Sequence, residues 1–152
     1  KALREAHPYE TIAYEVYSLI NSFSEVGMGR IGSLEKEMDL SSFLNFVKKQ
    51  LNSKVIRHSP PTNKLIKKVA VLGGSGSFAI EDAKRQGADA FITADLKYHQ
   101  FYQGEKSLLL VDVGHYESEQ YIKNFIFDYL TEKLPSFAFV LSRTKTNPVN
   151  YF

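Results

Sequence analysis

The apolar positions of this chain predict strands that alternate with helices over most of its length. Uninterrupted apolar runs are typical of strands covered on both faces of a sheet, whereas apolar residues at intervals of three and four indicate helices. The predicted strands are 55–56, 69–72, 90–93, 108–111 and 137–141. The predicted helices between them are 78–86 and 118–134. This alternation favours an α/β fold, a three-layer α/β/α sandwich with a mostly parallel sheet.

A further helix is predicted ahead of these strands. Asp39 or Ser41 can accept hydrogen bonds from the free amides of its first turn and so cap it. The apolar residues that share one face of this helix are Leu40, Phe43, Leu44, Val47 and Leu51. We expect the helix to belong to one compact unit that begins after Gly32.

The chain up to Gly32 is patterned differently. Residues 13–19 alternate between apolar and polar side chains, as in a half-buried strand. Three glycines within residues 27–32 predict a flexible hinge, because no clear strand-to-helix transition frames them as an anion-binding loop. The sequence begins at Lys1, partway into what reads as an element, so we expect a fragment of a longer protein.

Composition excludes several classes of function. With 152 residues, of which 43% are hydrophobic, the chain can bury one sizeable core. A net charge of +2 without a block of basic residues argues against nucleic-acid binding. The absence of cysteine excludes disulfides and thiolate metal ligands, and it fits a reducing compartment. No apolar stretch reaches membrane-spanning length, so we expect a soluble cytoplasmic protein.

Two polar residues continue the apolar stripe of the helix predicted over 118–134. The stripe consists of Ile122, Phe125, Ile126, Tyr129 and Leu130, which we expect to be buried. One and two turns earlier, the same face carries Glu119 and His115. Imidazole and carboxylate one helical turn apart are a common ligand pair for zinc, iron or manganese. Alternatively, Glu119 is a first-turn acid that complements the helix dipole and His115 is a surface residue.

Three loops follow the carboxyl ends of predicted strands, where α/β proteins place reactive groups. Residues 73–77 contain three glycines and could cradle a phosphate, or they form a tight turn with Ser77 as the helix N-cap. The second loop brings together Asp95, Lys97 and His99, an acid, a cation and an imidazole. The third carries His115. We expect the second and third loops to line one cleft suited to acid–base chemistry.

Four segments, in this order and spacing, resemble the carboxyl-terminal half of the NIF-three-like family, whose members are often called type 2 GTP cyclohydrolase I homologues. The segments are 73–77 (GGSGS), 92–99 (ITADLKYH), 112–119 (DVGHYESE) and 146–148 (TNP). Two earlier segments, HPYE and GMGRIG, resemble the end of the small inserted α+β domain, similar to CutA and PII proteins, that longer members carry. The resemblance divides the chain into 1–26, the tail of that insert, and 27–152, the carboxyl-terminal α/β half-domain.

The resemblance implies a dinuclear site for divalent zinc, iron or manganese ions and ring-shaped homo-hexamers. His115 and Glu119 match the two metal ligands that the second half of the family supplies. Asp95, Lys97 and His99 match a segment that lines the same cleft, and we assign them catalytic or supporting roles. The family's remaining ligands, adjacent histidines and a later aspartate, have no counterpart here, since the sequence contains no His-His pair. The site of this chain alone is therefore expected to be incomplete and inactive.

Two functions follow from the resemblance. One is a metal-dependent hydrolase in which the metal pair activates water against a nucleotide or phosphate substrate. The other is a non-enzymatic hexameric scaffold that binds metal or a partner protein. The sequence does not decide between them, and it predicts neither nucleic-acid nor membrane binding.

Overall fold

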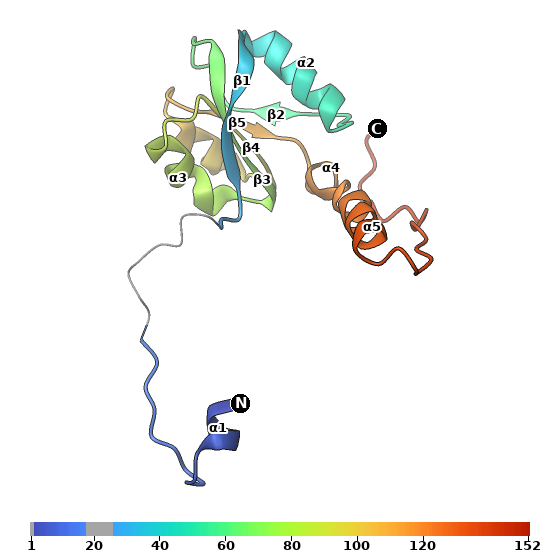
Figure 1. Cartoon of the computed structure of the whole chain (residues 1–152). Coiled ribbons are helices and arrows are strands. Elements are labelled where there is room, and N and C mark those ends of the chain that lie inside the picture. Colours follow the sequence, from blue (N-terminus) through green and yellow to red (C-terminus); the bar gives the residue numbers. More distant parts are fainter. Residues whose placement is uncertain (1, 18–25) are drawn as a thin grey trace.

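The computed structural model describes residues 2–17 and 26–152, and these are arranged as a mixed α/β fold (Figure 1). The helices are α1 (Ala2–Ala6), α2 (Leu40–Gln50), α3 (Ile80–Arg85), α4 (His115–Glu119) and α5 (Ile122–Lys133), with short 3-10 helices η1 (Ser77–Ala79) and η2 (Tyr98–Gly104). The strands are β1 (Arg30–Met38), β2 (Arg57–His58), β3 (Ile66–Ser75), β4 (Ala90–Ala94) and β5 (Leu109–Asp112). In both views α1 lies apart from the sheet.

The strands of the described residues form one sheet in the order β1-β3-β4-β5-β2. The three central strands are parallel, with Val71 opposite Ile92 and Ile92 opposite Val111. The edge strands β1 and β2 each run antiparallel to their neighbours. The predicted α/β class is confirmed, but the sheet is mixed rather than mostly parallel.

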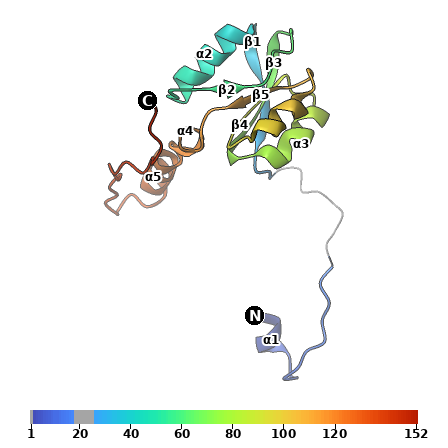
Figure 2. The same ribbon diagram turned by 180° about the vertical axis from the view of Figure 1, so that it is seen from behind.

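Alternate residues of the central strands enter two separate cores, one on each face of the sheet. On one face Ala70, Leu72, Phe91 and Leu110 pack with Ile80 and Ala83 of α3. On the other face Val69, Ala90, Leu109 and Val111 pack with Phe43 and Val47 of α2. Figure 2, seen from behind, shows α2 and α3 on different sides of the strands. Burial on both faces explains the apolar runs of β4 and β5, whereas in β3 Val71 is 42% exposed.

Helix α2 confirms the predicted amphipathic helix and one of its two predicted caps. The Asp39 carboxylate accepts a hydrogen bond from the Ser42 amide at 3.0 Å. The Ser42 hydroxyl also donates to this carboxylate, and the two bonds lower the pKa of Asp39 below its ordinary value. Phe43 and Val47 of the predicted face are buried.

Three predicted strands are wrong. Residues 13–17 are mostly exposed and have no regular secondary structure, while 18 and 19 lie outside the described residues. The strand predicted at 55–56 begins two residues later, where Arg57 pairs with Asp112. Residues 137–141 form no strand, because α5 carries the chain away from the sheet before them (Figure 1). An apolar run becomes a strand only where a neighbouring strand offers its hydrogen-bonding groups.

The glycine-rich stretch 27–32 is not simply a hinge, since β1 begins at Arg30 and includes Gly32. This strand is polar and mostly exposed because it forms an edge of the sheet, and for that reason its pattern does not indicate a strand.

The helix predicted over 118–134 is broken into α4 and α5, and its apolar stripe is not buried. No residue of α5 is buried, and Phe125 is 67% exposed. The break between the helices lies against the end of α2, where Gln120 donates to the Leu51 carbonyl at 2.8 Å. No helix in the described part of the chain combines the length and the apolar character needed to cross a membrane.

Candidate functional site

The candidate site lies where β4 and β5 end side by side. Thr93 is paired with Asp112, so the loops that follow the two strands leave the sheet together. Asp95 adopts a left-handed conformation with φ of 57° immediately after β4. Gly114, with φ of 92°, turns the chain from β5 into α4. These turns bring Asp95 and His115 together although 20 residues separate them.

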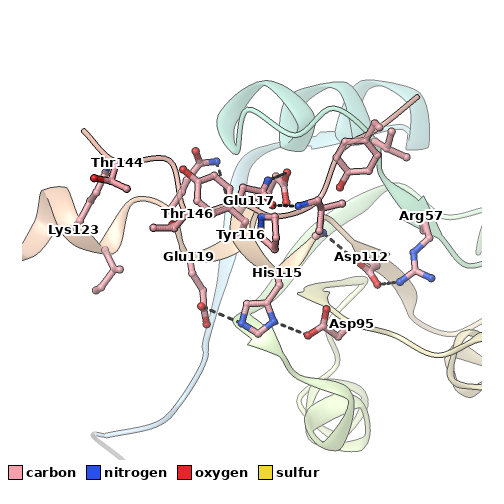
Figure 3. Close-up of a pocket in the computed structure, with 18 of the residues that line it drawn as sticks. Arg57, Asp95, Asp112, His115, Tyr116, Glu117, Glu119, Lys123, Thr144 and Thr146 are labelled. Carbon is pink, nitrogen blue, oxygen red and sulfur yellow. Dashed lines mark hydrogen bonds and ion pairs between the residues drawn. The ribbon is translucent and has the colours of Figure 1, made fainter. Parts of the chain in front are cut away.

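His115 stands between two carboxylates (Figure 3). Its Nδ1 lies 2.6 Å from Oδ2 of Asp95, and its Nε2 lies 3.2 Å from Oε2 of Glu119. About half of each side chain is exposed. The hydrogen bond to Asp95, helped by the negative charges of Asp95 and Glu119, raises the pKa of His115 although desolvation acts in the opposite direction. The pairing of His115 with Glu119 inferred from their spacing is therefore present in space.

The glycine loop approaches Glu119 closely. Gly74 has φ of 67°, and a Cβ at this position would lie 2.5 Å from Oε1 of Glu119. Its amide donates to the Ser118 hydroxyl at 2.8 Å, and its carbonyl accepts from the Thr93 hydroxyl at 3.0 Å. Gly73, Gly74 and Ser75 are the end of β3, where the pairing with β4 shifts register between Val71 and Ser75, so the turn predicted over 73–77 is limited to its last two residues. Because the amide and the carbonyl of Gly74 are both hydrogen-bonded within the protein, the stretch is better explained as an irregular strand end than as a phosphate cradle. The predicted N-cap Ser77 is wrong, since Gly76 occupies that place without a side-chain hydrogen bond.

A cavity of about 710 Å³ opens beside the His115 pair. Asp95, His115 and Glu119 line one part of it, and the irregular segment after α5 lines another. In that segment Asn147, from the 146–148 motif, donates to the Glu117 carboxylate at 3.3 Å. Residues from the last three of the four segments that carry the resemblance therefore line one cavity. In the first segment, Gly73 and Gly74 lie next to the Glu119 side chain.

Two buried carboxylates near the cavity were missed by the sequence reasoning. Asp112 is 3% and Glu117 is 6% exposed. Burial of Tyr151, together with the charges of Glu117 and Asp112, raises the pKa of the Tyr151 hydroxyl. The sequence does indicate a buried role for Asp112, because an acid at the end of a wholly apolar strand must find a buried partner.

Lys97 and His99 are not part of the group formed by Asp95, His115 and Glu119. Both side chains are exposed, and neither lines the cavity. Lys97 precedes η2, and its amide donates to the Gln100 side chain at 2.7 Å. Of the three residues predicted from this loop, Asp95 alone contacts His115, while catalytic roles for Lys97 and His99 stay predictions.

The donor set fits part of a metal site. A histidine that holds a metal through one ring nitrogen usually donates its other N–H to a carboxylate or a carbonyl. Asp95 takes that place at Nδ1, which leaves Nε2 beside the Glu119 carboxylate. Within residues 2–17 and 26–152, however, no three His, Asp or Glu side chains are grouped so that they could hold a metal ion. Further metal ligands would have to come from outside these described residues.

Comparisons with known proteins agree with the motifs. A model of the family described as Duf34/NIF3 (NGG1p interacting factor 3) matches residues 2–148. A GTP cyclohydrolase 1 type 2 homolog of Bacillus subtilis (strain 168) is 38% identical over 99% of this chain and 41% of its own length. A protein of the same name from Clostridium perfringens (strain 13 / Type A) is 36% identical over 84% of this chain and 50% of its own.

Solved structures show the same relationship. The crystal structure of a Bacillus cereus protein related to NIF3 superimposes with a TM-score of 0.78 at 36% identity, covering 99% of this chain and 43% of that one. The chain thus spans between about two fifths and one half of the length of these relatives. The family model covers nearly all of the sequence and the architecture agrees with it. The chain belongs to the Duf34/NIF3 family.

Proposed function

We propose that this chain contributes His115 and Glu119 to a site for two divalent metal ions, and that the complete protein containing it is a metal-dependent hydrolase. The observation that carries the proposal is the arrangement of Asp95, His115 and Glu119. Asp95 fixes one ring nitrogen of His115, so that the other can donate its lone pair beside a carboxylate at the mouth of a cavity. Zinc, iron and manganese accept this combination of nitrogen and oxygen ligands.

The residues of this chain have separate tasks in such a site. Asp95 holds the imidazole orientation, and Gly74 leaves room for the Glu119 carboxylate. The cavity of about 710 Å³ has the size of a small-molecule site. When bound, the metal ions would supply a hydroxide at neutral pH and polarise a phosphoryl or carbonyl oxygen.

The substrate class that we propose is a nucleotide or another phosphate compound. Lys123 lines the cavity and offers positive charge to an anion, while Thr144 and Thr146 can donate hydrogen bonds. The name GTP cyclohydrolase 1 type 2 homolog belongs to the relatives and is compatible with a purine nucleotide as substrate.

The missing ligands would come from the part of the relatives' length that this chain does not cover. We further propose, on the family resemblance, that the complete protein is a cytoplasmic homo-hexamer and that residues 1–26 belong to an inserted domain. Light scattering during size-exclusion chromatography measures the number of copies directly.

The test uses the complete protein that contains this chain. Metal content and the affinities for Zn²⁺ and Mn²⁺ would be measured together with turnover of a nucleotide panel, before and after His115→Ala. We expect the variant to lose both metal and turnover. His99→Ala is the control for metal binding, because it also removes an imidazole but lies outside the cavity. Metal binding without turnover of any substrate would favour the non-enzymatic scaffold instead.

A further inference from the structure

One buried carboxylate joins the two loops of the candidate site. Asp112, the last residue of β5, accepts a hydrogen bond from the Leu96 amide at 2.9 Å through Oδ2. Its other oxygen, Oδ1, accepts from the Gly114 amide at 3.1 Å. Leu96 follows Asp95 directly, and Gly114 precedes His115 directly. The loop that carries Asp95 and the loop that carries His115 are therefore fastened to the same side chain.

Arg57 completes this connection from the neighbouring strand. It lies opposite Asp112 in the pairing of β2 with β5, and its guanidinium forms an ion pair with the Asp112 carboxylate (Figure 3). The same guanidinium nitrogen donates to the Leu96 carbonyl at 3.0 Å. The guanidinium also lies 5.5 Å from the centre of the Phe101 ring, which restricts its position further.

Both polar groups of Leu96 are consequently held, the N–H by Asp112 and the carbonyl by Arg57. This matters because Asp95 has the left-handed backbone conformation, which is uncommon for residues other than glycine and is favoured here by the contacts of the next residue. Without these contacts the loop would relax toward an ordinary conformation. The carboxylate of Asp95 would then leave Nδ1 of His115.

We propose that Arg57 and Asp112 are positioning residues, which hold the Asp95 carboxylate against Nδ1 of His115 and thereby direct Nε2 toward a metal ion beside Glu119. The part of this inference that concerns the metal ion rests on the proposed function. The part that concerns the Asp95–His115 contact rests on the loop contacts alone.

A simple strand-pairing ion pair would look different. It would join β2 to β5 and leave the loops untouched, whereas each oxygen of Asp112 accepts a loop amide and Arg57 donates to a loop carbonyl. The Arg57 side chain is 55% exposed, so the protein tolerates its replacement without a large cavity. Arg57→Lys keeps the charge but replaces the guanidinium, whose Nη2 reaches the Asp112 and Leu96 oxygens with N–H bonds fixed in one plane, by an ammonium group on a shorter side chain.

The first experiment measures the affinity of the complete protein for Co²⁺ in Arg57→Lys and Asp112→Asn. Loss of a partner that orients a metal-bound histidine typically weakens affinity roughly 10–100-fold. We expect such a loss in both variants, and no larger loss in the double variant, because the two residues act as one unit. Asp82→Asn is the matched control, since it removes a surface ion pair with Arg85 on α3. Its affinity should equal that of the unmodified protein.

The second experiment determines crystal structures of the metal-free variants and measures the distance from Asp95 Oδ2 to His115 Nδ1. We expect it to exceed hydrogen-bonding distance in Arg57→Lys, while melting temperature stays near that of the unmodified protein. An unchanged contact in a folded Arg57→Lys protein would overturn the positioning role. If the unmodified protein binds no metal, the proposed function fails, but the distance still decides whether Arg57 and Asp112 position the pair.

Discussion

Replacing Gly74 with alanine should damage stability and metal binding by two separable effects. Gly74 has φ of 67°, and an alanine there pays the cost of a left-handed conformation, about 1–2 kcal/mol. In the 152-residue chain, a loss of that order lowers the melting temperature by roughly 2–8 °C, and in the longer complete protein by less. The new Cβ would also lie 2.5 Å from Oε1 of Glu119 and 3.4 Å from Cε1 of His115.

The second effect acts on the candidate ligand. To restore van der Waals contact, the Glu119 carboxylate must move on the order of 1 Å. Glu119 is half-exposed and can move without a large loss of stability. A metal site, however, tolerates deviations of only about 0.2 Å in its ligand distances. We therefore expect a strong loss of metal affinity in the complete protein in addition to the lower melting temperature.

Gly87→Ala separates the two effects. Gly87 has φ of 70°, almost the same as Gly74, but a Cβ there meets no atom within 4 Å. The Gly87→Ala variant should therefore lose a similar amount of stability and keep the metal affinity of the unmodified protein. Urea unfolding gives the free energy of each variant, and calorimetric titration gives its metal affinity. Equal metal affinity in Gly74→Ala and Gly87→Ala would refute the placement of Glu119 as a ligand behind the glycine loop.

Three further outcomes can be measured. In the complete protein, a chelator should lower the melting temperature of the unmodified form but hardly that of His115→Ala. The reason is that a metal at 100 times its Kd contributes about 2.7 kcal/mol to the stability of the form that binds it. An equal drop in both forms would exclude His115 as a ligand. Without metal, the hydrogen bond to Asp95 raises the pKa of His115 in the folded protein. The stabilisation from this contact is therefore fully present below the unfolded-state pKa of about 6.5 and is lost as pH rises through the higher folded-state pKa. The difference in unfolding free energy between the unmodified form and His115→Gln should shrink across that window, and a difference that grows with pH would contradict the Asp95 contact. The 152-residue chain alone should bind Zn²⁺ more weakly than the complete protein by more than roughly 100-fold, because it lacks whole ligands rather than hydrogen-bond partners of ligands. Similar affinities of the two proteins in calorimetry would show that His115 and Glu119 suffice.

Local sequence determined those features whose physical causes are local. Asp39 caps α2 because a carboxylate one residue ahead of a helix reaches the amides of its first turn. His115 and Glu119 meet because residues four apart share a helix face. The central strands were predictable because sheet residues buried on both faces must be apolar.

Tertiary structure decided what depends on partners distant in the chain. Periodicity showed that α5 has an apolar face, but it cannot specify what covers that face. Within this chain the apolar face of α5 is exposed. Asp95 reaches His115 only because β4 and β5 are parallel neighbours that end together. Arg57 meets Asp112 across 55 residues through the pairing of a two-residue edge strand, which no local pattern could indicate. Contacts of this kind arise from the packing of the whole sheet, so local sequence could indicate His115 and Glu119 as candidates but not the residues that hold them in place.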